Sequence, residues 1–545
     1  MISASTFSVY DMIKRNASLF PDDTAIVDGG KSLTFHEFLV QVNSLASALS
    51  GSGVMPRQSV AVLSMNRTEY LVLYGATSAI GAILVPLNWR LSQDELAYIL
   101  KDSASKILFF DSTQSENAHA LKIKSERESS GFNGLFVCFD RCDHIDSSTN
   151  TINYEELIDR GLLSKPQSTR FLHQSDDIFT LLYTAAVAGK PRGAALSHNN
   201  IMASNLQTCL TMNLGKSDTY LNMLPLFHIT GMNLSLAVMQ MGGKNVIMEK
   251  FNPTTALSMI ENEKITLMAS FPPILATLMD ELDKGKTIES CKTKIDESGG
   301  HGKVEQCPYD ISSLKNTVGI DSPETILKFM EKTSTRFYIL YGQCETSGFV
   351  TLGDASECPG SAGRQGCISN MAIVDGNDLI LPSGQSGEIA VRGPLVFQGF
   401  WRGGSAKEDR YDTSTIKNGW HHTGDVGHID SNGYLWFEGR KPEKELIKPG
   451  GENVYPAEVE YVIMENPDIE ETCVIGVPDP KFGEGVKAVC VRKAGSCLTA
   501  KELIDFVGSR IARYKKPGYV EFVQSLPKNS DGSVDRKKVK ELYSM

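Results

Sequence analysis

The stretch that decides the fold is TLLYTAAVAGKPRGAALSHNN, residues 180–200. Its apolar start runs into small residues, and the basic turn KPRG follows at 190–193. Small side chains let backbone N–H groups approach an oxyanion, and a nearby cation adds charge, so the stretch predicts a phosphate-binding loop. A helix is expected after the turn, with Ser197 or Asn199 as its N-cap. The alternative interpretation is an ordinary strand–turn–helix corner of an α/β domain.

The bulk composition is typical of a multidomain α/β protein. With 545 residues the chain exceeds what one hydrophobic core accommodates, so roughly two to four domains are expected. Its net charge of −11, without long basic runs, argues against a nucleic-acid partner. Eleven scattered cysteines with no CxxC pair indicate reduced thiols rather than a disulfide framework or a zinc site.

The apolar stretches set an expectation about location. The N-terminus lacks a basic start followed by an apolar core, so no secretory signal is expected. The most apolar early stretch, 70–87, is short and is interrupted by glycine and proline, so no transmembrane segment is expected. A cytoplasmic location is predicted, and a homodimer is left open as the oligomeric state.

Helix and strand patterns alternate through most of the first 365 residues. This rhythm predicts an α/β fold with a large N-terminal portion of doubly wound mixed sheets. The expected helices span 35–49, 70–80, 93–101 and 254–264, with another from 230, and the expected strands span 59–63, 82–85, 107–110, 178–183, 220–224, 244–248, 265–269 and 337–340. Residues 113–153 are interpreted as irregular apart from a strand at 135–139. The charged segment 281–310 is interpreted as a surface insertion.

The character of the sequence changes twice near the C-terminus. Short strands expected at 379–381, 388–391, 427–429 and 434–438 predict a small antiparallel, barrel-like unit within 365–440. The run KPEKELIKPGGEN at 441–453 has the composition of a hinge. A small α+β tail follows, with helices expected at 456–465 and 499–513 and strands at 471–477, 486–491 and 519–522. We therefore expect an N-terminal domain, 1–440, and a mobile C-terminal lid, 441–545.

Eight motifs occur in one order along the chain. They are YTxxxxGxPRG at 183–193, PLFHxxG at 225–231, YGxxE at 341–345, GxxGR at 360–364, TGD at 423–425, GR at 439–440, GGENVYPAEVE at 450–460 and PKxxxGxxxR at 527–536. With these motifs the chain resembles the adenylate-forming enzymes, which include acyl- and aryl-CoA ligases, peptide-synthetase adenylation domains and firefly-type luciferases. The resemblance covers nearly the whole chain and favours the acyl-CoA synthetase branch.

The resemblance implies an activity and its co-substrates. The expected enzyme is an AMP-forming acid–CoA ligase that uses ATP and Mg²⁺ to make an acyl-adenylate and then transfers the acyl group to CoA. It also implies that the nucleotide-binding N-terminal domain, 1–440, binds the acid, and that the lid rotates between the two half-reactions.

Most of the implied site residues bind the nucleotide. Asp425 would accept hydrogen bonds from both ribose hydroxyls, with Arg440 as the second ribose contact. Tyr341 would stack on or flank the adenine, and Gly342 would keep the backbone close. The alternative for Asp425 is a turn aspartate after glycine. The other expected contacts with nucleotide are Thr184, Gly189, Arg192, Gln343 and Cys344.

Catalytic roles are implied for three residues. Glu345 would hold Mg²⁺, a hard cation that prefers carboxylate and phosphate oxygens. Its alternative is a first-turn glutamate at the positive end of a helix. His228 would gate the acyl pocket or pack on the acyl-phosphate, although a lone His after Phe is often a core residue. Arg192 would supply positive charge near the phosphates.

The remaining implied residues belong to the lid. Lys448, Gly450 and Gly451 would form the thiol-channel loop that serves CoA. The pivot of the lid is expected at Glu443 or Lys444.

Three departures from the family pattern concern phosphate chemistry. The loop hydroxyls are replaced by AAVA at 185–188, the threonine of YGxTE is Cys344, and the lid lysine that bridges carboxylate and α-phosphate is Ser533. Loss of a charge aimed at a developing anion costs on the order of 3–4 kcal/mol.

Three hypotheses follow from these departures. The first is a working ligase of a variant subgroup, in which Arg192, or a lysine among Lys528, Lys537 and Lys538, supplies the missing charge. The second is an enzyme that retains mainly the thioester-forming half-reaction. The third is a non-catalytic AMP- or acyl-CoA-binding protein.

The acid is expected to be fatty or aryl. The pocket would be built from residues 227–233, 270–271, 316–322 and 341–350, which are mostly apolar. An amino-acid substrate is disfavoured because the family uses an acidic residue early in the pocket for that class.

Overall fold

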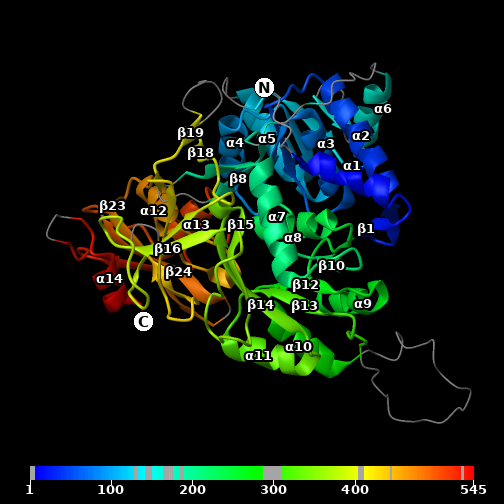
Figure 1. The fold of residues 1–545 in the computed structure, drawn as a ribbon. Helices are drawn as coiled ribbons and strands as arrows, with labels where there is room; N and C mark the ends of the chain where they lie inside the picture. The colour runs from blue at the N-terminus through cyan, green and yellow to red at the C-terminus, as the bar shows by residue number, and fades with distance from the viewer. Residues whose placement is uncertain are drawn as a thin grey trace, which may run out of the picture.

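The computed structural model describes residues 7–127, 132–140, 150–163, 171, 174, 176–184, 190–285, 309–402, 410–441, 445–480, 482–529 and 533–544. In Figure 1 the N-terminal elements, in blue and cyan, lie at the upper right, and the green elements lie below them. The C-terminal elements, in orange and red, lie at the left. The predicted α/β class is confirmed, with two large mixed sheets, a curled antiparallel sheet and a C-terminal α/β part.

Nine strands form one mixed sheet in the described part of the chain, in the order β19-β18-β9-β8-β4-β3-β5-β6-β7. Pairing is parallel from β8 to β7 and antiparallel from β8 to β19. The strands are β3 Ser59–Leu63, β4 Ile83–Pro86, β5 Ile107–Phe110, β6 Leu135–Cys138, β7 Thr151–Asn153, β8 Ile178–Thr184, β9 Arg192–Ser197, β18 Phe400–Trp401 and β19 Tyr411–Asp412.

A second mixed sheet has the order β15-β14-β13-β12-β10-β11-β1-β2, with parallel pairs between antiparallel edges. Its strands are β1 Thr24–Asp28, β2 Lys31–Thr34, β10 Thr219–Asn222, β11 Lys244–Ile247, β12 Leu267–Ser270, β13 Asn316–Gly319, β14 Arg336–Gln343 and β15 Gly348–Asp354. Strand β14 continues beyond Ile339, which pairs with the last residue of β13, so the YGxxE motif begins in the carboxyl end of β14.

Helices cover both sheets. They are α1 Val9–Leu19, α2 Phe35–Gly51, α3 Thr68–Ile80, α4 Gln93–Asp102, α5 Ser115–Arg127, α6 Tyr154–Leu163, α7 His198–Met212, α8 Ile229–Gln240, α9 Pro253–Glu263, α10 Ile274–Lys284 and α11 Pro323–Thr333. The helices α7 and α8 pack against each other in the centre of Figure 1, and most of their residues are buried.

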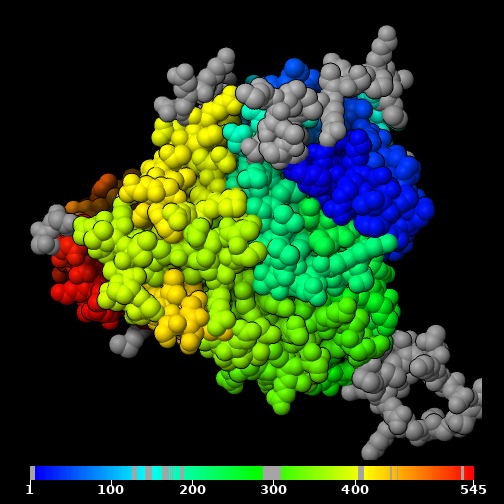
Figure 2. Space-filling view, in the orientation of Figure 1, coloured from blue at the N-terminus to red at the C-terminus, as the bar shows by residue number. Residues whose placement is uncertain are grey.

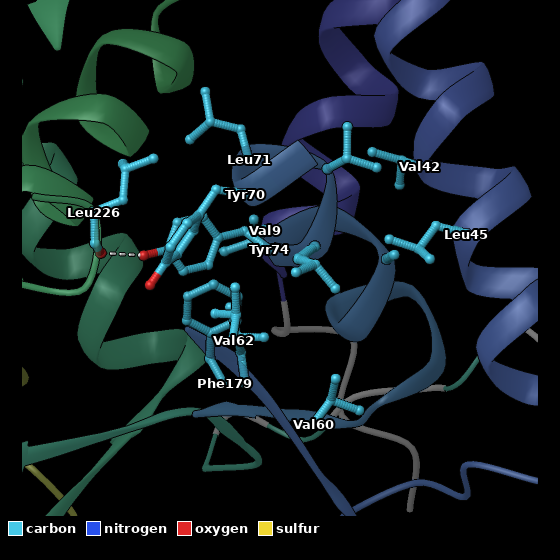
Figure 3. Packing of buried hydrophobic residues seen from close by; sticks show 14 of the residues in the cluster. Val9, Val42, Leu45, Val60, Val62, Tyr70, Leu71, Tyr74, Phe179 and Leu226 are labelled. Carbon is cyan, nitrogen blue, oxygen red and sulfur yellow. Dashed lines mark hydrogen bonds between the residues drawn. The ribbon is translucent and has the colours of Figure 1, made fainter. Parts of the chain in front are cut away.

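An aromatic cluster joins α3 to the turn that precedes α8. Tyr70 and Tyr74 of α3 are fully buried beside Phe179 of β8 (Figure 3). The Tyr74 hydroxyl donates a 2.6 Å hydrogen bond to the carbonyl of Leu226, drawn as a dashed line in Figure 3. The core of the first sheet therefore fixes the PLFHxxG turn.

A smaller antiparallel sheet follows, in the order β16-β17-β21-β20 with β22 paired to β21. Its strands are β16 Asn370–Val374, β17 Gly387–Arg392, β20 Ile416–Lys417, β21 Trp420–Ile429 and β22 Leu435–Arg440. In Figure 2 the yellow and yellow-green residues of this region cover the front left of the molecule. The TGD motif lies within β21, so Asp425 is a strand residue and the turn interpretation is wrong.

The C-terminal part, residues 445–544 as described, has the three-stranded sheet β23-β24-β25 and three helices. Its elements are α12 Pro456–Met464, β23 Ile469–Asp479, β24 Gly483–Arg492, α13 Ala500–Gly508, β25 Tyr519–Val523 and α14 Arg536–Tyr543. Helix α13 ends five residues before the predicted position 513, because residues 509–512 turn toward the rest of the chain.

Three other expectations about elements are wrong. Residues 115–127 form α5, and the helix α10 extends to Lys284, into the segment interpreted as irregular. Residues 379–381 make only an isolated bridge from Ile380 to Val374. Between the basic turn and the expected helix, which is α7 capped by Ser197, residues 192–197 form the unpredicted strand β9, paired with β8. The rest of the insertion, 286–308, lies outside the described residues.

Across the described residues, no helix is both long enough and apolar enough to span a bilayer.

Candidate active site

A buried carboxylate lies where the two sequence motifs YGxxE and TGD meet. Asp425 is 1% exposed, and its Oδ2 accepts hydrogen bonds from the Tyr341 hydroxyl at 2.8 Å and from Gln343 Nε2 at 2.6 Å. Arg440 lies opposite Asp425 in the β21–β22 ladder, and its Nε is 3.0 Å from Oδ1. Four of the predicted site residues are therefore brought together.

The Oδ1 atom of Asp425 is the open acceptor of this group. Its ion pair with Arg440 lacks hydrogen-bond alignment, and Oδ1 has no hydrogen-bond partner among the described residues. Burial alone would lower the pKa of Arg440, but the charge of Asp425 and the contacts with Tyr455 and Tyr341 raise the pKa overall. Burial raises the pKa of Tyr341, and the Asp425 charge adds to that rise. This buried oxygen, Oδ1, therefore has acceptor capacity that the described residues do not use.

The backbone beside Asp425 is held by Glu388 of β17. One Glu388 oxygen accepts from the Gly424 N–H at 2.8 Å, and the other accepts from Lys441 Nζ at 2.8 Å. His422 Nδ1 is 2.9 Å from the same second oxygen. Burial raises the pKa of Glu388, but the hydrogen bonds from Lys441, His422 and Gly424, together with the Lys441 charge, outweigh burial and the net shift is downward. Glu388 thus ties the TGD motif to the first residue of the linker.

Two aromatic rings border the carboxylate group. The ring of Phe437 lies 6.3 Å from that of Tyr341, and Phe437 is 46% exposed although it is a large apolar residue. Gly342 leaves no space for a side chain, because a Cβ there would lie 1.7 Å from the carbonyl oxygen of Gly348. The site therefore offers an exposed apolar ring face beside a tightly packed backbone.

Only the two ends of the predicted phosphate loop belong to the described residues. Thr184 and Arg192 face each other across the β8–β9 hairpin, whereas 185–189, with Gly189, lie outside the described residues. Ser197 caps α7 through its side chain, so Asn199 is not the N-cap. The Arg192 guanidinium forms an ion pair with Asp412 and lies 3.7 Å over the Phe400 ring. Its charge is engaged by the β18–β19 hairpin.

Glu345 lies in the short 3-10 turn Cys344–Thr346, between β14 and β15. Phe397 donates its N–H to the Glu345 carbonyl at 2.9 Å, which fixes this turn. The thiol of Cys344 is a poor anion, because burial and then the Glu345 charge raise its pKa. Within the described ranges, His, Cys, Asp and Glu side chains do not form a group of three or more that could hold a metal ion.

His228 follows the turn fixed by Tyr74 and precedes α8 as its N-cap. Asn66 also brackets this turn, donating to the Leu224 carbonyl and accepting from the Leu226 N–H, each at 2.8 Å. The His228 ring accepts the Thr230 N–H at 3.3 Å. Its dense protein surroundings, and then the charge of Arg90, lower its pKa to about 4. The side chain nevertheless stays exposed, so it is a neutral imidazole at an accessible position.

The loop 447–455 of the C-terminal part faces these groups. Arg440 Nη1 donates to the Tyr455 hydroxyl at 3.0 Å, and Arg90 forms an ion pair with Glu452. Burial, and then Arg440, lower the pKa of Lys448. Gly450 has φ 59°, and its N–H donates to the Phe482 carbonyl at 3.0 Å. Gly451 ends the 3-10 turn Pro449–Gly451.

Ser533 is an exposed residue of the C-terminal part, beside an isolated antiparallel bridge between Lys528 and Val534. Asn529 donates to the Ser533 hydroxyl at 3.0 Å and to its carbonyl at 2.8 Å. Lys528, one of the residues considered as a source of compensating charge, forms a 2.6 Å ion pair with Glu471. The predicted pivot residues, Glu443 and Lys444, lie outside the described residues.

Two family profiles match the chain in the order of its motifs. The profile of the AMP-binding enzyme matches residues 13–401, and that of the AMP-binding enzyme C-terminal domain matches residues 458–533. The chain belongs to the AMP-binding enzyme family.

Relatives of this AMP-binding enzyme are acid–CoA ligases. It is 33% identical to indoleacetate–CoA ligase of Aromatoleum aromaticum over 98% of each chain. It is 30% identical to feruloyl-CoA synthase of an Amycolatopsis species over 97% of this chain and 98% of the relative. The assignment to the acyl-CoA ligase branch is confirmed.

Two solved structures of one relative, o-succinylbenzoate CoA synthetase from Bacillus subtilis, match this AMP-binding enzyme to different extents. A double mutant bound to a product analogue, OSB-NCoA, has TM-score 0.79 at 26% identity, over 97% of this chain and 98% of that chain. The complex with the acyl-adenylate intermediate has TM-score 0.64 at 25% identity, over 97% of both chains. The present arrangement is more similar to the structure with the CoA product analogue.

The geometry adds residues that motif reasoning left without a role. Tyr455 and Glu452 belong to the GGENVYPAEVE motif, but only their contacts with Arg440 and Arg90 connect them with the site. Phe437 lies two residues before the GR motif, and an aromatic residue at this place is the signal that the sequence offers.

Proposed function

We propose that this AMP-binding enzyme joins a carboxylic acid to CoA in two steps. The acid attacks the α-phosphate of ATP to give an acyl-adenylate and pyrophosphate. The CoA thiol, losing its proton, then attacks the acyl carbon and AMP leaves. The observation that carries the proposal is the buried Asp425, whose open Oδ1 lies beside Arg440 and whose Oδ2 is held by Tyr341.

In this proposal the carboxylate group binds the nucleoside. The open Oδ1 accepts from ribose hydroxyls, because a carboxylate oxygen is a strong acceptor with more than one lone pair. Arg440 neutralises the buried charge and stays oriented by it. The adenine packs beside Tyr341 and Phe437, whose rings offer an apolar face.

Glu345 is the residue proposed to meet the metal. A single carboxylate fits Mg²⁺ when phosphate oxygens complete its coordination, as Mg²⁺ is commonly held by one or two carboxylates together with substrate phosphates. Bound there, Mg²⁺ would neutralise charge on the phosphates. Thr184 and the segment containing Gly189 would contact the phosphates from the opposite hairpin.

For the second step, the C-terminal part 441–545 is proposed to act as a lid that brings the loop 447–455 to the site. The two matched structures of one relative support two lid arrangements, because the CoA-analogue complex and the acyl-adenylate complex differ in similarity to this chain. Lys448, Gly450 and Gly451 would border the thiol path. His228 would lie beside the same thiol path. Because its imidazole is neutral, it would not repel cations bound to the acyl-phosphate.

A second candidate function rests on Ser533 and Arg192. Ser533 offers no positive charge for adenylation, and Arg192 is already engaged by Asp412 and Phe400. An enzyme that performs mainly the thioester-forming step would need neither residue to reach the α-phosphate. It is distinguished by rapid turnover of supplied acyl-adenylate and slow turnover of acid with ATP.

The acid is proposed to be aryl or fatty. The relatives that match over their whole length act on indoleacetate and ferulate by name, and the segments proposed for the pocket are mostly apolar. The decisive experiment supplies ATP, Mg²⁺, CoA and a panel of aryl, aryl-alkyl and fatty acids, with pyrophosphate and acyl-CoA as readouts. Absence of both products with every acid, from folded protein, would contradict the first proposal; acyl-CoA formed only from supplied acyl-adenylates would favour the second.

A further inference from the structure

The N-terminus of α4 makes a set of contacts that the reaction does not explain. Ser92 and Glu95 form its capping box, with the Ser92 N–H donating to Glu95 Oε2 at 2.8 Å. Both residues also bind the C-terminal part. The Ser92 hydroxyl donates to the Arg510 carbonyl at 2.9 Å, and Glu95 Oε2 accepts the Ala512 N–H at 3.1 Å.

A buried lysine completes this contact. Lys515 Nζ lies 2.6 Å from Glu95 Oε1 and 2.8 Å from Glu458 Oε2. The three side chains are 2%, 11% and 5% exposed for Lys515, Glu95 and Glu458. Burial raises the pKa of Glu458, and it lowers that of Lys515 less than the two carboxylates raise it. Water is largely excluded from the group, so each charge depends on the others.

The two ion pairs of Lys515 differ in origin. Glu458 belongs to α12, in the same C-terminal part as Lys515, and their pair needs no particular placement of that part. Glu95 belongs to α4, and its pair forms only when the C-terminal part lies as it does here. Glu95 is therefore the partner that depends on the arrangement of the lid.

We propose that Glu95 is a positioning residue that holds the C-terminal part in the arrangement that presents the loop 447–455 to the site. Five residues earlier, Arg90 pairs with Glu452 of that same loop, so the segment 90–95 binds the C-terminal part at two places. The inference rests on the proposed function, in which this arrangement serves the CoA step. It assigns to Glu95 an effect on thioester formation and little effect on adenylation.

The test is the variant Glu95→Gln. Glutamine keeps the capping box, because its side-chain oxygen still accepts the Ser92 N–H, but it removes the charge facing Lys515. The matched control is Asp94→Asn, which removes a charge from the same helical turn. Asp94 pairs with Lys124 on the surface and not with the C-terminal part. A changed macrodipole interaction would affect both variants alike.

The first readout is amide hydrogen exchange in the peptide containing Ala512, with α4 itself as an internal measure of folding. Glu95→Gln is expected to raise exchange at Ala512 roughly thirtyfold or more, the scale of losing one partner of a buried charge pair. Exchange in α4 and throughout Asp94→Asn should stay at the wild-type rate. Unchanged Ala512 exchange in Glu95→Gln, or equal increases in both variants, would overturn the proposal.

The second readout separates the half-reactions. With an acid from the panel that is turned over, Glu95→Gln should slow thioester formation from supplied acyl-adenylate roughly tenfold while changing pyrophosphate release less than about twofold. Equal slowing of both steps would refute the positioning role. If no acid is turned over, the proposed function fails, but the exchange experiment still decides whether Glu95 holds the C-terminal part.

Discussion

The hydroxyl of Tyr455 accepts a 3.0 Å hydrogen bond from Nη1 of Arg440, whose Nε lies 3.0 Å from Asp425. One guanidinium thus contacts a carboxylate of the antiparallel sheet and a residue of the C-terminal part. Displacing the C-terminal part would remove the Tyr455 contact and leave the pair with Asp425 in place. Under the proposed function, Arg440 would contact the ribose-binding carboxylate on one side and the C-terminal part on the other.

The variant Asp425→Asn should bind AMP roughly ten- to a hundredfold more weakly, because hydrogen bonds to charged groups contribute about 1.5–3 kcal/mol each. An amide also turns its NH2 group, which is a donor, either toward Arg440 or toward Tyr341 and Gln343, which themselves donate. Calorimetric titration with AMP measures the change. The control is Glu438→Gln on the neighbouring strand, an exposed residue paired with His428. Wild-type affinity in Asp425→Asn would exclude the ribose role.

The variant Ser533→Lys should accelerate adenylation alone. A charge restored to a developing anion is worth roughly a hundred- to a thousandfold in rate. Pyrophosphate release should rise by that order, while thioester formation from supplied acyl-adenylate stays constant. The control Ser533→Gln adds a long side chain without charge. Equal rates in Ser533→Lys and wild type would show that this position does not limit the first step.

His228 should not titrate between pH 5.5 and 8, since its pKa is lowered to about 4. NMR titration of the imidazole signals measures this directly. Arg90→Gln should raise the pKa, because it removes a positive charge that disfavours the imidazolium. A His228 that titrates near 6.5 in wild type would contradict the structure.

The same shift gives a direction for stability. In the folded state His228 binds its proton less readily than in the unfolded chain, where its pKa is near 6.5. The contribution is fully present above pH 6.5 and is lost as the pH falls toward 4. Denaturation of His228→Gln should show a weaker loss across that interval than wild type.

Tyr74→Phe should destabilise the protein by about 1–3 kcal/mol, because the buried Leu226 carbonyl loses its hydrogen bond. Tyr70→Phe is the matched control: Tyr70 is equally buried one turn away, and its hydroxyl has no hydrogen-bond partner in the described part of the chain. It should be neutral or slightly stabilising. Urea unfolding measures the free energy of unfolding of both variants. Equal decreases in the two variants would contradict a stabilising role for the hydrogen bond.

Much of the fold could be predicted from periodicity. The helices α2, α3 and α4 and the strands β3 and β5 were expected within one or two residues, since each has a continuous apolar pattern. The helix α5 was missed because SENAHALKIKSER is mostly polar. The strand β9 was missed because its pairing with β8 outweighs the weak strand preference of an alanine-rich segment.

The candidate site was predicted less completely. Motif order identified Tyr341, Asp425 and Arg440, and the structure brings these three together. The partner of Arg192 could not be predicted, because Asp412 lies 220 residues away and its segment carries no motif. Nor does spacing alone reveal that Lys515 would lie between two carboxylates.

The contact between Lys515 and Glu95 joins residues 420 positions apart in the chain. During synthesis, the residues of α4 are therefore made long before Lys515. The N-terminus of α4 does not need the later residues for its hydrogen bonds. Ser92 and Glu95 bond each other in the capping box, and water can solvate their remaining polar atoms. The helix α4 can thus form before Lys515 is synthesised and bind Lys515 afterwards.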